Sequence, residues 1–559
     1  MIASLPFLIS GAALAVVYYK FIHLFTRSRT SSKSVLPRLP GPPSPSFLLG
    51  NFLETLQAES GLTYEAWFNK YGPVIRYHSI CGSIGLSTVD PVALKHILVK
   101  KAYDYPKPEH LRNEMIKLVG LGLLLSEGDD HKRQRKLLNP TFSPGQLRDL
   151  TPVVFKIAHK LSSKWSELLS KNGEKSKGYV LIDTLPWMNR VALDIIGLAG
   201  FGHNFESLEH FGKSELANAF HAITQTDFEL SKLGGISIFL MNFFRNIPIL
   251  YDLLYHERAK AKAHSLRVME RETKKLLVKA QNKEAGKDFI SVLASANKAE
   301  EGTRDKMDDG ELMGQMTTFL FAGHETTASA LTWQLWILAK HPQVQTKLRE
   351  ELLDAIEHRD ASAEAEGIPL SMNDLLSLPY LNAFVREGMR LYPPVFATAR
   401  VASHDDQIPL SKPVLTRTGE IVDRLDIRAG EMITIPIYSF NRSKEIFGES
   451  CLEFDPERWL QEDSKNSGVG LMGGLLSFLS GPRACIGYKF ALIEMKAILL
   501  VLVTKFKFQE RDEGGGPNFE QRGPLVMKPR PRGENEGGKM PLRNLKSNLI
   551  IGNLVKLQY

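Results

Sequence analysis

The decapeptide FLSGPRACIG, residues 478–487, places a single cysteine in a short, glycine-containing stretch ahead of a long apolar segment. Cys485 could serve as a nucleophile, as a metal ligand or as a packed core residue. A nucleophile needs a nearby base and zinc needs several Cys or His ligands, but the sequence around Cys485 supplies neither. A single thiolate acting as the axial ligand of haem iron is the remaining metal interpretation.

The residues on either side of this cysteine suit a ligated thiolate. Gly481 and Gly487 allow backbone amides to approach the sulfur, and the start of the following helix adds a positive dipole. Arg483, two residues before the cysteine, can pair with an anionic carboxylate. The sequence therefore predicts a tight loop that presents one thiolate next to one cation.

A second pattern, AGHETT at residues 322–327, lies inside a predicted helix over residues 309–340. Apolar or small residues recur in this segment with the 3.6-residue period of a helix. His341 and Pro342 end the pattern. Because a helix of this length spans roughly 45 Å, we expect it to run through the whole body of the protein.

Two further patterns carry charges at helical or turn positions. Glu387 and Arg390 stand three residues apart in a predicted helix that stops before Pro393, so their side chains share one helix face. The segment FDPERW, residues 454–459, adds a third charged residue, Arg458.

Together these patterns resemble the cytochrome P-450 family of haem-thiolate monooxygenases. Phe478, Gly481, Arg483, Cys485 and Gly487 match the family signature F-x-x-G-x-R-x-C-x-G. The other patterns follow in the family's order, and the resemblance extends from the proline-rich stretch to about residue 542. It implies a mainly α fold with small β-sheets, a long central helix over the haem, and haem b with Cys485 as the axial ligand of its iron.

The resemblance also implies roles for residues of the central helix. Ala322 and Gly323 would leave room for dioxygen and substrate. Thr326 would turn its hydroxyl into a local widening of the helix that holds a water molecule. Glu325 would relay protons, because splitting bound dioxygen requires two protons at its outer oxygen.

Glu387, Arg390 and Arg458 are implied to form a buried charge network that fixes the loop holding Cys485. This role is structural and not catalytic. A buried charge that loses its partner is strongly destabilising, so removing one member should reduce haem retention.

Two more segments are implied to contact the haem propionates. In GDDHKRQRKLLNPTF, residues 128–142, Arg135 fits the family's arginine, and His131 stands where tryptophan is commoner but can still donate a hydrogen bond. Arg400, after PPVFATA, fits another propionate arginine. The expected substrate pocket, each member of which could also be an ordinary core residue, comprises Phe319, Ala322, Val395 and Phe396.

Electrons must come from another protein, because the chain shows no flavin or nicotinamide module. We expect an NADPH–cytochrome reductase to supply them, with a cytochrome b-type protein as an alternative donor. A basic patch on the thiolate side would steer an acidic flavoprotein, although solvated surface cations are an equally simple explanation. The candidate residues are Lys132, Arg133, Lys136, Lys489 and Lys496.

The composition excludes other classes of protein. The 559 residues carry a net charge of +8, which is modest for this length and does not indicate a nucleic-acid partner. The sparse, odd set of Cys81, Cys451 and Cys485 argues against a disulfide framework and fits a reducing compartment.

The amino-terminal region has the pattern of a membrane anchor. Residues 2–19 carry no charged side chain, and with the apolar residues after Lys20 the run is long enough to cross a bilayer of about 30 Å. Lysine and arginine follow the run and do not precede it, which favours an uncleaved signal anchor over a cleaved signal peptide. We therefore expect a single-pass protein of the endoplasmic reticulum whose catalytic body faces the cytosol.

These observations divide the chain into four segments. The transmembrane anchor occupies residues 1–25, and a basic, proline-rich linker that would act as a stiff strut occupies residues 26–51. The catalytic domain covers residues 52–545, and a tail of unassigned function covers residues 546–559. The uncharged residues 233–244 are either buried core or a second contact with the bilayer.

The expected reaction is insertion of one oxygen atom from dioxygen into a lipophilic compound, by hydroxylation or epoxidation. Terpenoids, fatty acids and foreign aromatic compounds are candidate substrates, and similarity to fungal members of the family favours secondary metabolism. Two alternatives remain: a haem-thiolate isomerase or dehydratase that acts on peroxides, and a non-enzymatic haem sensor. Neither needs both Glu325 and Thr326.

Overall fold

The computed structural model describes residues 34–172, 179–210, 215–216, 218–219, 256–281, 286–300, 302–359, 363, 367–461, 468–511, 519–523, 525–533 and 538–546. Among the helices in these ranges, none is both long and apolar enough to cross a membrane. The predicted anchor, the apolar segment 233–244 and residues 547–559 lie outside the described residues.

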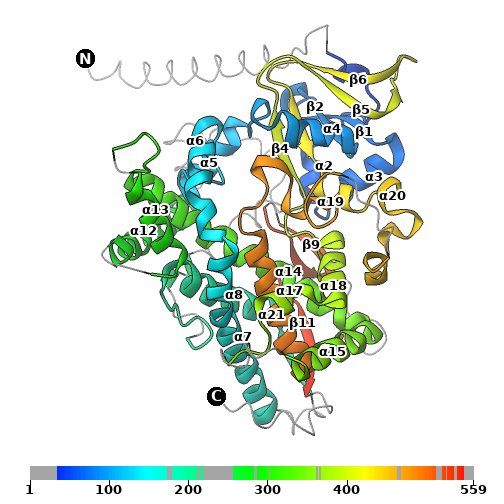
Figure 1. Cartoon of the computed structure of the whole chain (residues 1–559). Helices are drawn as coiled ribbons and strands as arrows, with labels where there is room; N and C mark the ends of the chain where they lie inside the picture. The colour runs from blue at the N-terminus through cyan, green and yellow to red at the C-terminus, as the bar shows by residue number, and fades with distance from the viewer. Residues whose placement is uncertain are drawn as a thin grey trace, which may run out of the picture.

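Helices make up most of the described chain, as the sequence predicts, and they surround one long central helix (Figure 1). The helices are α2 (Phe52–Gln57), α3 (Leu62–Tyr71), α4 (Pro91–Lys95), α5 (Glu109–Val119), α6 (Gly128–Leu138), α7 (Pro144–Asn172), α8 (Thr184–Phe201), α12 (His256–Gln281), α13 (Phe289–Ala299), α14 (Asp309–Lys340), α15 (Pro342–Glu357), α17 (Met372–Ser377), α18 (Pro379–Leu391), α19 (Ile437–Asn441), α20 (Lys444–Phe447) and α21 (Tyr488–Lys505).

The central helix is α14, and its bounds confirm the predicted helix over residues 309–340. Asp308 caps its first turn by accepting a hydrogen bond from the amide of Glu311 at 2.7 Å, and Glu311 accepts one from the amide of Asp308 at 3.3 Å. The helix ends at His341, before the proline that opens α15. Most side chains between Leu312 and Ala339 are buried, so α14 is a core helix that runs through the body.

The strands form four small sheets. The largest has the order β1-β2-β7-β4, in which β2 and β7 are parallel and the other neighbours are antiparallel. The strands are β1 (Val74–His78), β2 (Ile84–Thr88), β3 (Val180–Asp183), β4 (Thr398–Val401), β5 (Asp406–Leu415), β6 (Ile421–Ile427), β7 (Met432–Ile435), β8 (Phe506–Gln509), β9 (Phe519–Arg522), β10 (Lys528–Pro531) and β11 (Pro541–Lys546).

Strand β1 lies in the segment GPVIRYHS, and β7 forms the first part of the segment EMITIPIYS. The second part of that segment instead turns into the short helix α19. In the remaining sheets, β5 pairs with β6, β9 pairs with β10, and β11 lies between β3 and β8.

Two main hydrophobic cores hold these elements together, beside a small third cluster of Trp67, Ile75 and Tyr77. The larger surrounds α14 and includes Trp165 of α7, whose ring meets Phe506 and Phe508 of β8 edge-on. The smaller lies at the four-stranded sheet and includes Leu86 and Ile433. Both cores are built from side chains far apart in the sequence, so the cysteine loop and the central helix are fixed to one framework.

The proline-rich stretch before residue 52 differs from the expected strut. Leu36 and Leu39 are fully buried in the smaller core. Arg76 of β1 donates hydrogen bonds to the carbonyl oxygens of Leu39 and Pro40, at 3.1 and 2.9 Å. Proline prevents a helix here, but it does not prevent leucine side chains from packing, so residues 34–51 form part of the body.

Candidate active site

The loop before α21 holds Cys485 through backbone contacts. Residues Leu476–Phe478 and Gly481–Arg483 form short 3₁₀ turns, and α21 begins at Tyr488. The amide of Cys485 donates a hydrogen bond to the carbonyl oxygen of Phe478 at 2.9 Å, which closes the loop.

Gly481 permits this loop to lie against another segment of the chain. Its φ is +69°, and a Cβ atom at this position would stand only 2.1 Å from the carbonyl oxygen of Leu98. Any other residue would have to push the two segments apart. The glycine of the sequence pattern is therefore explained by a close approach between backbones.

The thiol of Cys485 is both accessible and desolvated. Its side chain is accessible, whereas Arg483 and Ala484 just before it are buried. Burial raises the pKa of the Cys485 thiol, while a hydrogen bond from the amide of Gly487 and the charge of Arg135 lower it. A thiol that is accessible and yet desolvated can be reached by a ligand held inside the fold.

A buried cluster of cations lies beside the loop. Arg483 donates hydrogen bonds to the carbonyl oxygen of Ala102 and to the carboxylate of Glu127. Glu127 also accepts hydrogen bonds from the amide and the Nζ atom of Lys107, both at 3.0 Å. Burial would raise the pKa of Glu127, but Lys107 and Arg483 outweigh it and lower that pKa.

Two predicted residues, His131 and Arg400, belong to the same cluster. Burial, together with the charges of Lys107 and Arg483, lowers the pKa of His131 to about 4, so the imidazole is neutral at pH 7. Its Nδ1 atom lies 3.0 Å from the hydroxyl of Tyr103. Burial, together with the charge of Arg483, lowers the pKa of Arg400 to about 10.

The cluster has an excess of positive charge. Lys107, Arg135, Arg400 and Arg483 are cationic, while Glu127 is the carboxylate that pairs with Lys107 and Arg483 among the described residues. Burial and the neighbouring arginines lower the pKa of Lys107 to about 8, although Glu127 opposes this shift. Uncompensated buried cations are unfavourable, so this part of the fold is suited to an additional anionic group.

Haem fits both parts of this arrangement. Its two propionates would supply the negative charge that the cations lack, and the Nε atom of Arg483 is a buried donor with no hydrogen-bond partner among the described residues. The accessible thiol of Cys485 would supply the axial ligand. Sequence reasoning missed Lys107, Glu127 and Tyr103, because no short pattern marks them.

The structure brings the predicted charge network together. Arg390 donates hydrogen bonds from Nε and Nη2 to the two carboxylate oxygens of Glu387, each at 2.8 Å, and both side chains are fully buried. Arg458 donates to the same carboxylate at 3.1 Å. Trp459 adds an indole donor at 2.8 Å. With the amide of Asp455, at 3.0 Å, five donors thus satisfy one buried carboxylate, and the two arginines balance its charge.

Asn441, which the sequence did not single out, connects this network to the cysteine loop. Its carbonyl oxygen accepts a hydrogen bond from Arg390 at 3.1 Å. Its side chain accepts from the amide of Leu476 at 2.9 Å and donates to the hydroxyl of Ser477 at 2.8 Å. The network can therefore fix the loop that carries Cys485 through a defined chain of hydrogen bonds.

Glu325 and Thr326 lie near the middle of α14. The hydroxyl of Thr326 donates a hydrogen bond to the carbonyl oxygen of Ala322 at 2.6 Å, one turn earlier. The whole of α14 is regular α-helix, and the local widening expected at Thr326 is not seen in it. The carboxylate of Glu325 is nearly buried and pairs with Lys528 of β10, at 3.1 Å.

The space at Gly323 serves helix packing. A Cβ atom there would meet the side chain of Ile196 from α8 at 3.0 Å, so the missing side chain makes room for α8. The expected room for dioxygen beside Ala322 and Gly323 stays a prediction. Ala322, beside it, is half-buried.

The expected pocket residues differ in their surroundings. Phe319 packs in an aromatic cluster with Phe142 and Phe289, whose ring centroids lie 5.8 and 6.3 Å away, which is the environment of a core residue. Val395 and Phe396 are half-buried in the segment between α18 and β4. Their roles as pocket residues stay predictions.

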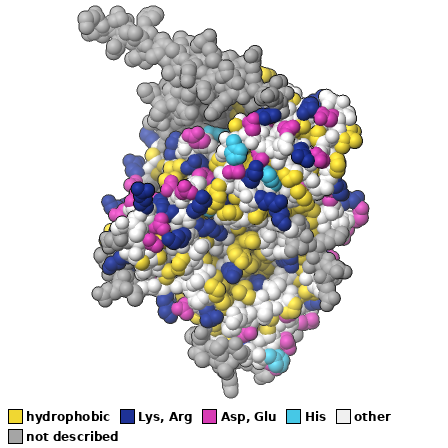
Figure 2. Space-filling view, turned by 45° about the horizontal axis from the view of Figure 1, so that its top comes forward, with side chains coloured by type: hydrophobic (Ala, Val, Ile, Leu, Met, Phe, Trp, Pro, Cys, Tyr) yellow, Lys and Arg dark blue, Asp and Glu magenta, His cyan; other side chains and the backbone are white. Residues whose placement is uncertain are grey.

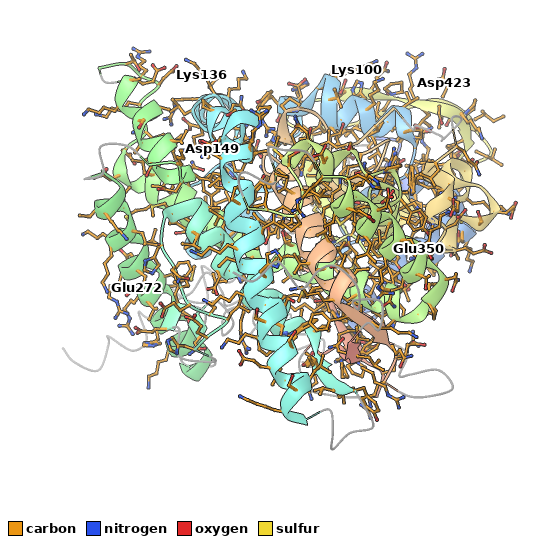
Figure 3. The ribbon with its side chains drawn as sticks, turned by 60° about the horizontal axis from the view of Figure 1, so that its bottom comes forward. Lys100, Lys136, Asp149, Glu272, Glu350 and Asp423 are labelled. Atoms are coloured by element: carbon orange, nitrogen blue, oxygen red, sulfur yellow. The ribbon has the colours of Figure 1, made fainter. Side chains whose placement is uncertain are left out.

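The five basic residues proposed for a docking patch do not form one exposed group. Lys496 is buried and donates a hydrogen bond to Asn382, and Arg133 is mostly buried in ion pairs with Asp130 and Glu311. Lys132 and Lys136 are exposed but pair with acidic side chains. Figure 2 shows basic and acidic side chains intermixed on one face, and Figure 3 shows Lys136 at the outer edge of the body.

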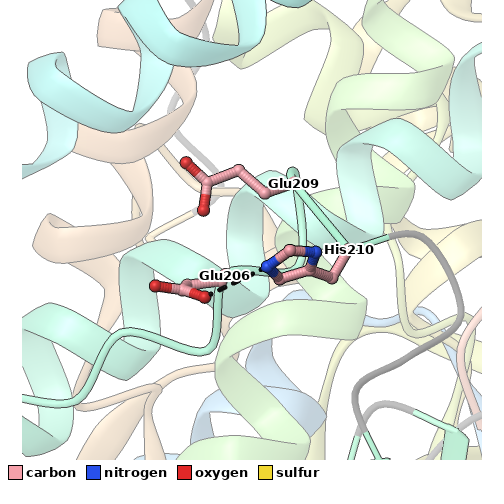
Figure 4. A group of neighbouring side chains, drawn as sticks. All are labelled: Glu206, Glu209 and His210. Atoms are coloured by element: carbon pink, nitrogen blue, oxygen red, sulfur yellow. Dashed lines mark ion pairs between the residues drawn. The ribbon is translucent and has the colours of Figure 1, made fainter.

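An exposed group of potential metal ligands lies away from these residues. Glu206, Glu209 and His210 follow α8, and their ligand atoms all lie within 4.8 Å of one another (Figure 4). Glu209 already pairs with Lys160 at 2.8 Å, and His210 pairs with Glu206 at 3.4 Å. We interpret the group as surface ion pairs.

Comparison with known proteins agrees with this site. The family model described as cytochrome P-450 matches residues 40–534. The chain is 38% identical to cytochrome P-450 monooxygenase 205 of Postia placenta over 514 residues, 89% of this chain and 90% of that protein. It is 35% identical to cytochrome P-450 monooxygenase claO of Ampulloclitocybe clavipes over 545 residues, 95% of this chain and 98% of that protein. The chain therefore belongs to the cytochrome P-450 family, whose members hold haem iron through a cysteine thiolate.

Proposed function

We propose that this protein is a membrane-anchored monooxygenase of the endoplasmic reticulum with its catalytic body in the cytosol. Its reaction takes one dioxygen, two electrons and two protons, and gives a hydroxylated or epoxidised product and water. The observation that carries this proposal is the accessible, desolvated thiol of Cys485 beside a buried cluster of cations. Such a site suits haem held through a thiolate, whose electron donation favours cleavage of the O–O bond.

The residues of the chain have distinct tasks in this proposal. Cys485 would ligate the iron, and Lys107, Arg400 and Arg483 would hold the propionates. Glu325 and Thr326 of α14 move protons toward the bound dioxygen. The two electrons come from NADPH through a separate flavin-containing reductase that docks on the thiolate side.

We propose lipophilic substrates, with terpenoids, fatty acids and foreign aromatic compounds as the candidate classes. The apolar residues 2–19 support this choice, since an anchored enzyme meets compounds that partition into the membrane. Relatives from two fungi support a role in fungal secondary metabolism.

The first experiment is the carbon monoxide difference spectrum of reduced membranes that contain the full chain. We expect a red-shifted haem band in the parent and its loss in Cys485→Ser. Oxygen consumption is then measured with NADPH, with and without reductase, since an isomerase, a dehydratase or a haem sensor would not need reductase. Full-length protein that binds no haem, or activity that ignores reductase, would contradict the proposal.

A further inference from the structure

The acidic residue of the central helix has a cationic partner from a distant part of the chain. Lys528 of β10 places its Nζ atom 3.1 Å from the Oε1 atom of Glu325. The side chain of Glu325 is 6% exposed, whereas that of Lys528 is 22% exposed. The pair therefore spans the boundary between the interior beside α14 and the surrounding water.

The backbone that carries Lys528 is fixed on two sides. The amide of Met527 donates a hydrogen bond to the carbonyl oxygen of Pro394 at 2.8 Å. The carbonyl oxygen of Met527 accepts one from the hydroxyl of Ser329, one turn beyond Glu325 on α14. Lys528 itself stands opposite Arg522 in the β9–β10 pair. Its position relative to Glu325 is thus set by the fold and not by a flexible loop.

The pair also determines the direction in which Glu325 points. Adjacent residues of an α-helix project about 100° apart, and the hydroxyl of Thr326 already donates to the carbonyl oxygen of Ala322. The carboxylate of Glu325 is bound to Lys528 on the β10 side. A proton can therefore pass from Glu325 to Thr326 only through a water molecule or by rotation of the glutamate.

We propose that Lys528 is a positioning residue that holds the carboxylate of Glu325 at the water boundary, where it takes up the protons that Thr326 delivers. This inference rests on the proposed monooxygenase function. The step balances as substrate plus dioxygen, two electrons from NADPH and two protons from water, giving the oxygenated product and water. When proton delivery through this pair fails, dioxygen takes the same two electrons and two protons directly from solvent and leaves as hydrogen peroxide, while the substrate stays unchanged.

Lys528→Met removes the charge but keeps most of the side-chain volume. The carboxylate of Glu325 would then be nearly buried without its cation and would turn away from this position toward water. That movement interrupts repeated proton uptake. Lys528→Arg restores a cation and Lys528→Gln keeps a polar group without charge, while Lys507→Met, at an exposed position of β8, is the matched control.

The test uses full-length protein with reductase, NADPH and dodecanoic acid as a lipophilic probe, and measures hydrogen peroxide per NADPH oxidised. This ratio reports proton delivery whether or not the probe is oxygenated. We expect Lys528→Met to raise the ratio about threefold or more, and Glu325→Gln to do the same. The double variant, which carries Lys528→Met and Glu325→Gln, should give a ratio no higher than that of either single variant, because both changes act on one pair. Lys528→Arg should restore the ratio, and Lys507→Met should match the parent.

Each other outcome has a defined meaning. An unchanged ratio in Lys528→Met, with an intact carbon monoxide band, overturns the inference. If Glu325→Gln changes the ratio while Lys528→Met does not, the proposed role of Glu325 survives and that of Lys528 fails. If neither changes it, the proton-relay part of the proposed function fails. Loss of the red-shifted band in both Lys528→Met and Lys528→Gln would assign Lys528 to folding and also overturn the inference.

Discussion

The guanidinium of Arg135 donates a hydrogen bond from Nη1 to the carbonyl oxygen of Ala484, 2.8 Å away, on the residue that precedes Cys485. The resemblance to the family assigns Arg135 to a haem propionate. In the structure this side chain connects α6 to the cysteine loop, and its charge lowers the pKa of the Cys485 thiol. Arg135 therefore acts on the thiol of Cys485 as well as on the loop that carries it.

Replacing Arg135 should weaken thiolate ligation. In Arg135→Leu, the loop loses one charge-assisted hydrogen bond and the thiolate loses a nearby positive charge. Together these losses should destabilise the ligated thiolate by about 1.5–3 kcal/mol. The measurement is the share of haem that gives the red-shifted carbon monoxide band. Arg135→Lys, which keeps the charge but not the planar donor geometry, should fall between Leu and the parent. Equal spectra for all three proteins would contradict this assignment.

Asn441→Ala should release the cysteine loop from the charge network. The variant removes a donor to Ser477 and the acceptor for the buried amide of Leu476, and leaving that amide unpaired costs about 1–3 kcal/mol. We expect haem to dissociate faster, measured by transfer to apomyoglobin. Arg390→Leu should have a larger effect, because it leaves the buried carboxylate of Glu387 without its closest cation.

Glycine substitutions can separate backbone strain from crowding. Gly481→Ala combines a left-handed φ of +69° with a Cβ atom 2.1 Å from the carbonyl oxygen of Leu98. Gly419→Ala carries a φ of +84° in the β5–β6 turn, with nothing within 4 Å of the new Cβ atom. The second variant should cost about 1–2 kcal/mol in the free energy of unfolding. The first should cost more and should also reduce haem content, which the Gly419 variant should leave unchanged.

The pH dependence of stability should include a contribution from His131. Its pKa falls from 6.5 to about 4 on folding, mainly because of burial. Between these values the unfolded chain binds a proton that the folded protein does not, so the free energy of unfolding decreases as the pH falls from about 6.5 toward 4. The full effect of this group is about 3 kcal/mol.

His131→Gln should remove that part of the acid destabilisation. Denaturant unfolding at several pH values between 7 and 4.5 would show a shallower decrease for the variant than for the parent. His159, whose pKa is also lowered to about 4, mainly by burial, supplies a second acid-sensitive group. His159→Gln should therefore remove a separate and additive share. Parallel pH curves for His131→Gln and the parent would show that His131 does not titrate as described.

The sequence alone determined the local features of this protein. It predicted α14 to its first and last residue, because helical periodicity, the acidic start and the final His-Pro pair are local signals. It also identified Cys485 and the partnership of Glu387, Arg390 and Arg458, because motif spacing and the family resemblance carried them.

The tertiary structure decided which distant residues meet. Lys107, Glu127 and Asn441 belong to the site only because α5, α6 and α19 fold against the cysteine loop, and no spacing rule relates them to Cys485. The pairing of Lys528 with Glu325 joins residues 203 positions apart. The tertiary structure also decided which residues are buried. It placed Lys496 in the interior and the leucines of the proline-rich stretch in a core. Periodicity reports which face of an element is apolar, whereas packing decides what that face meets.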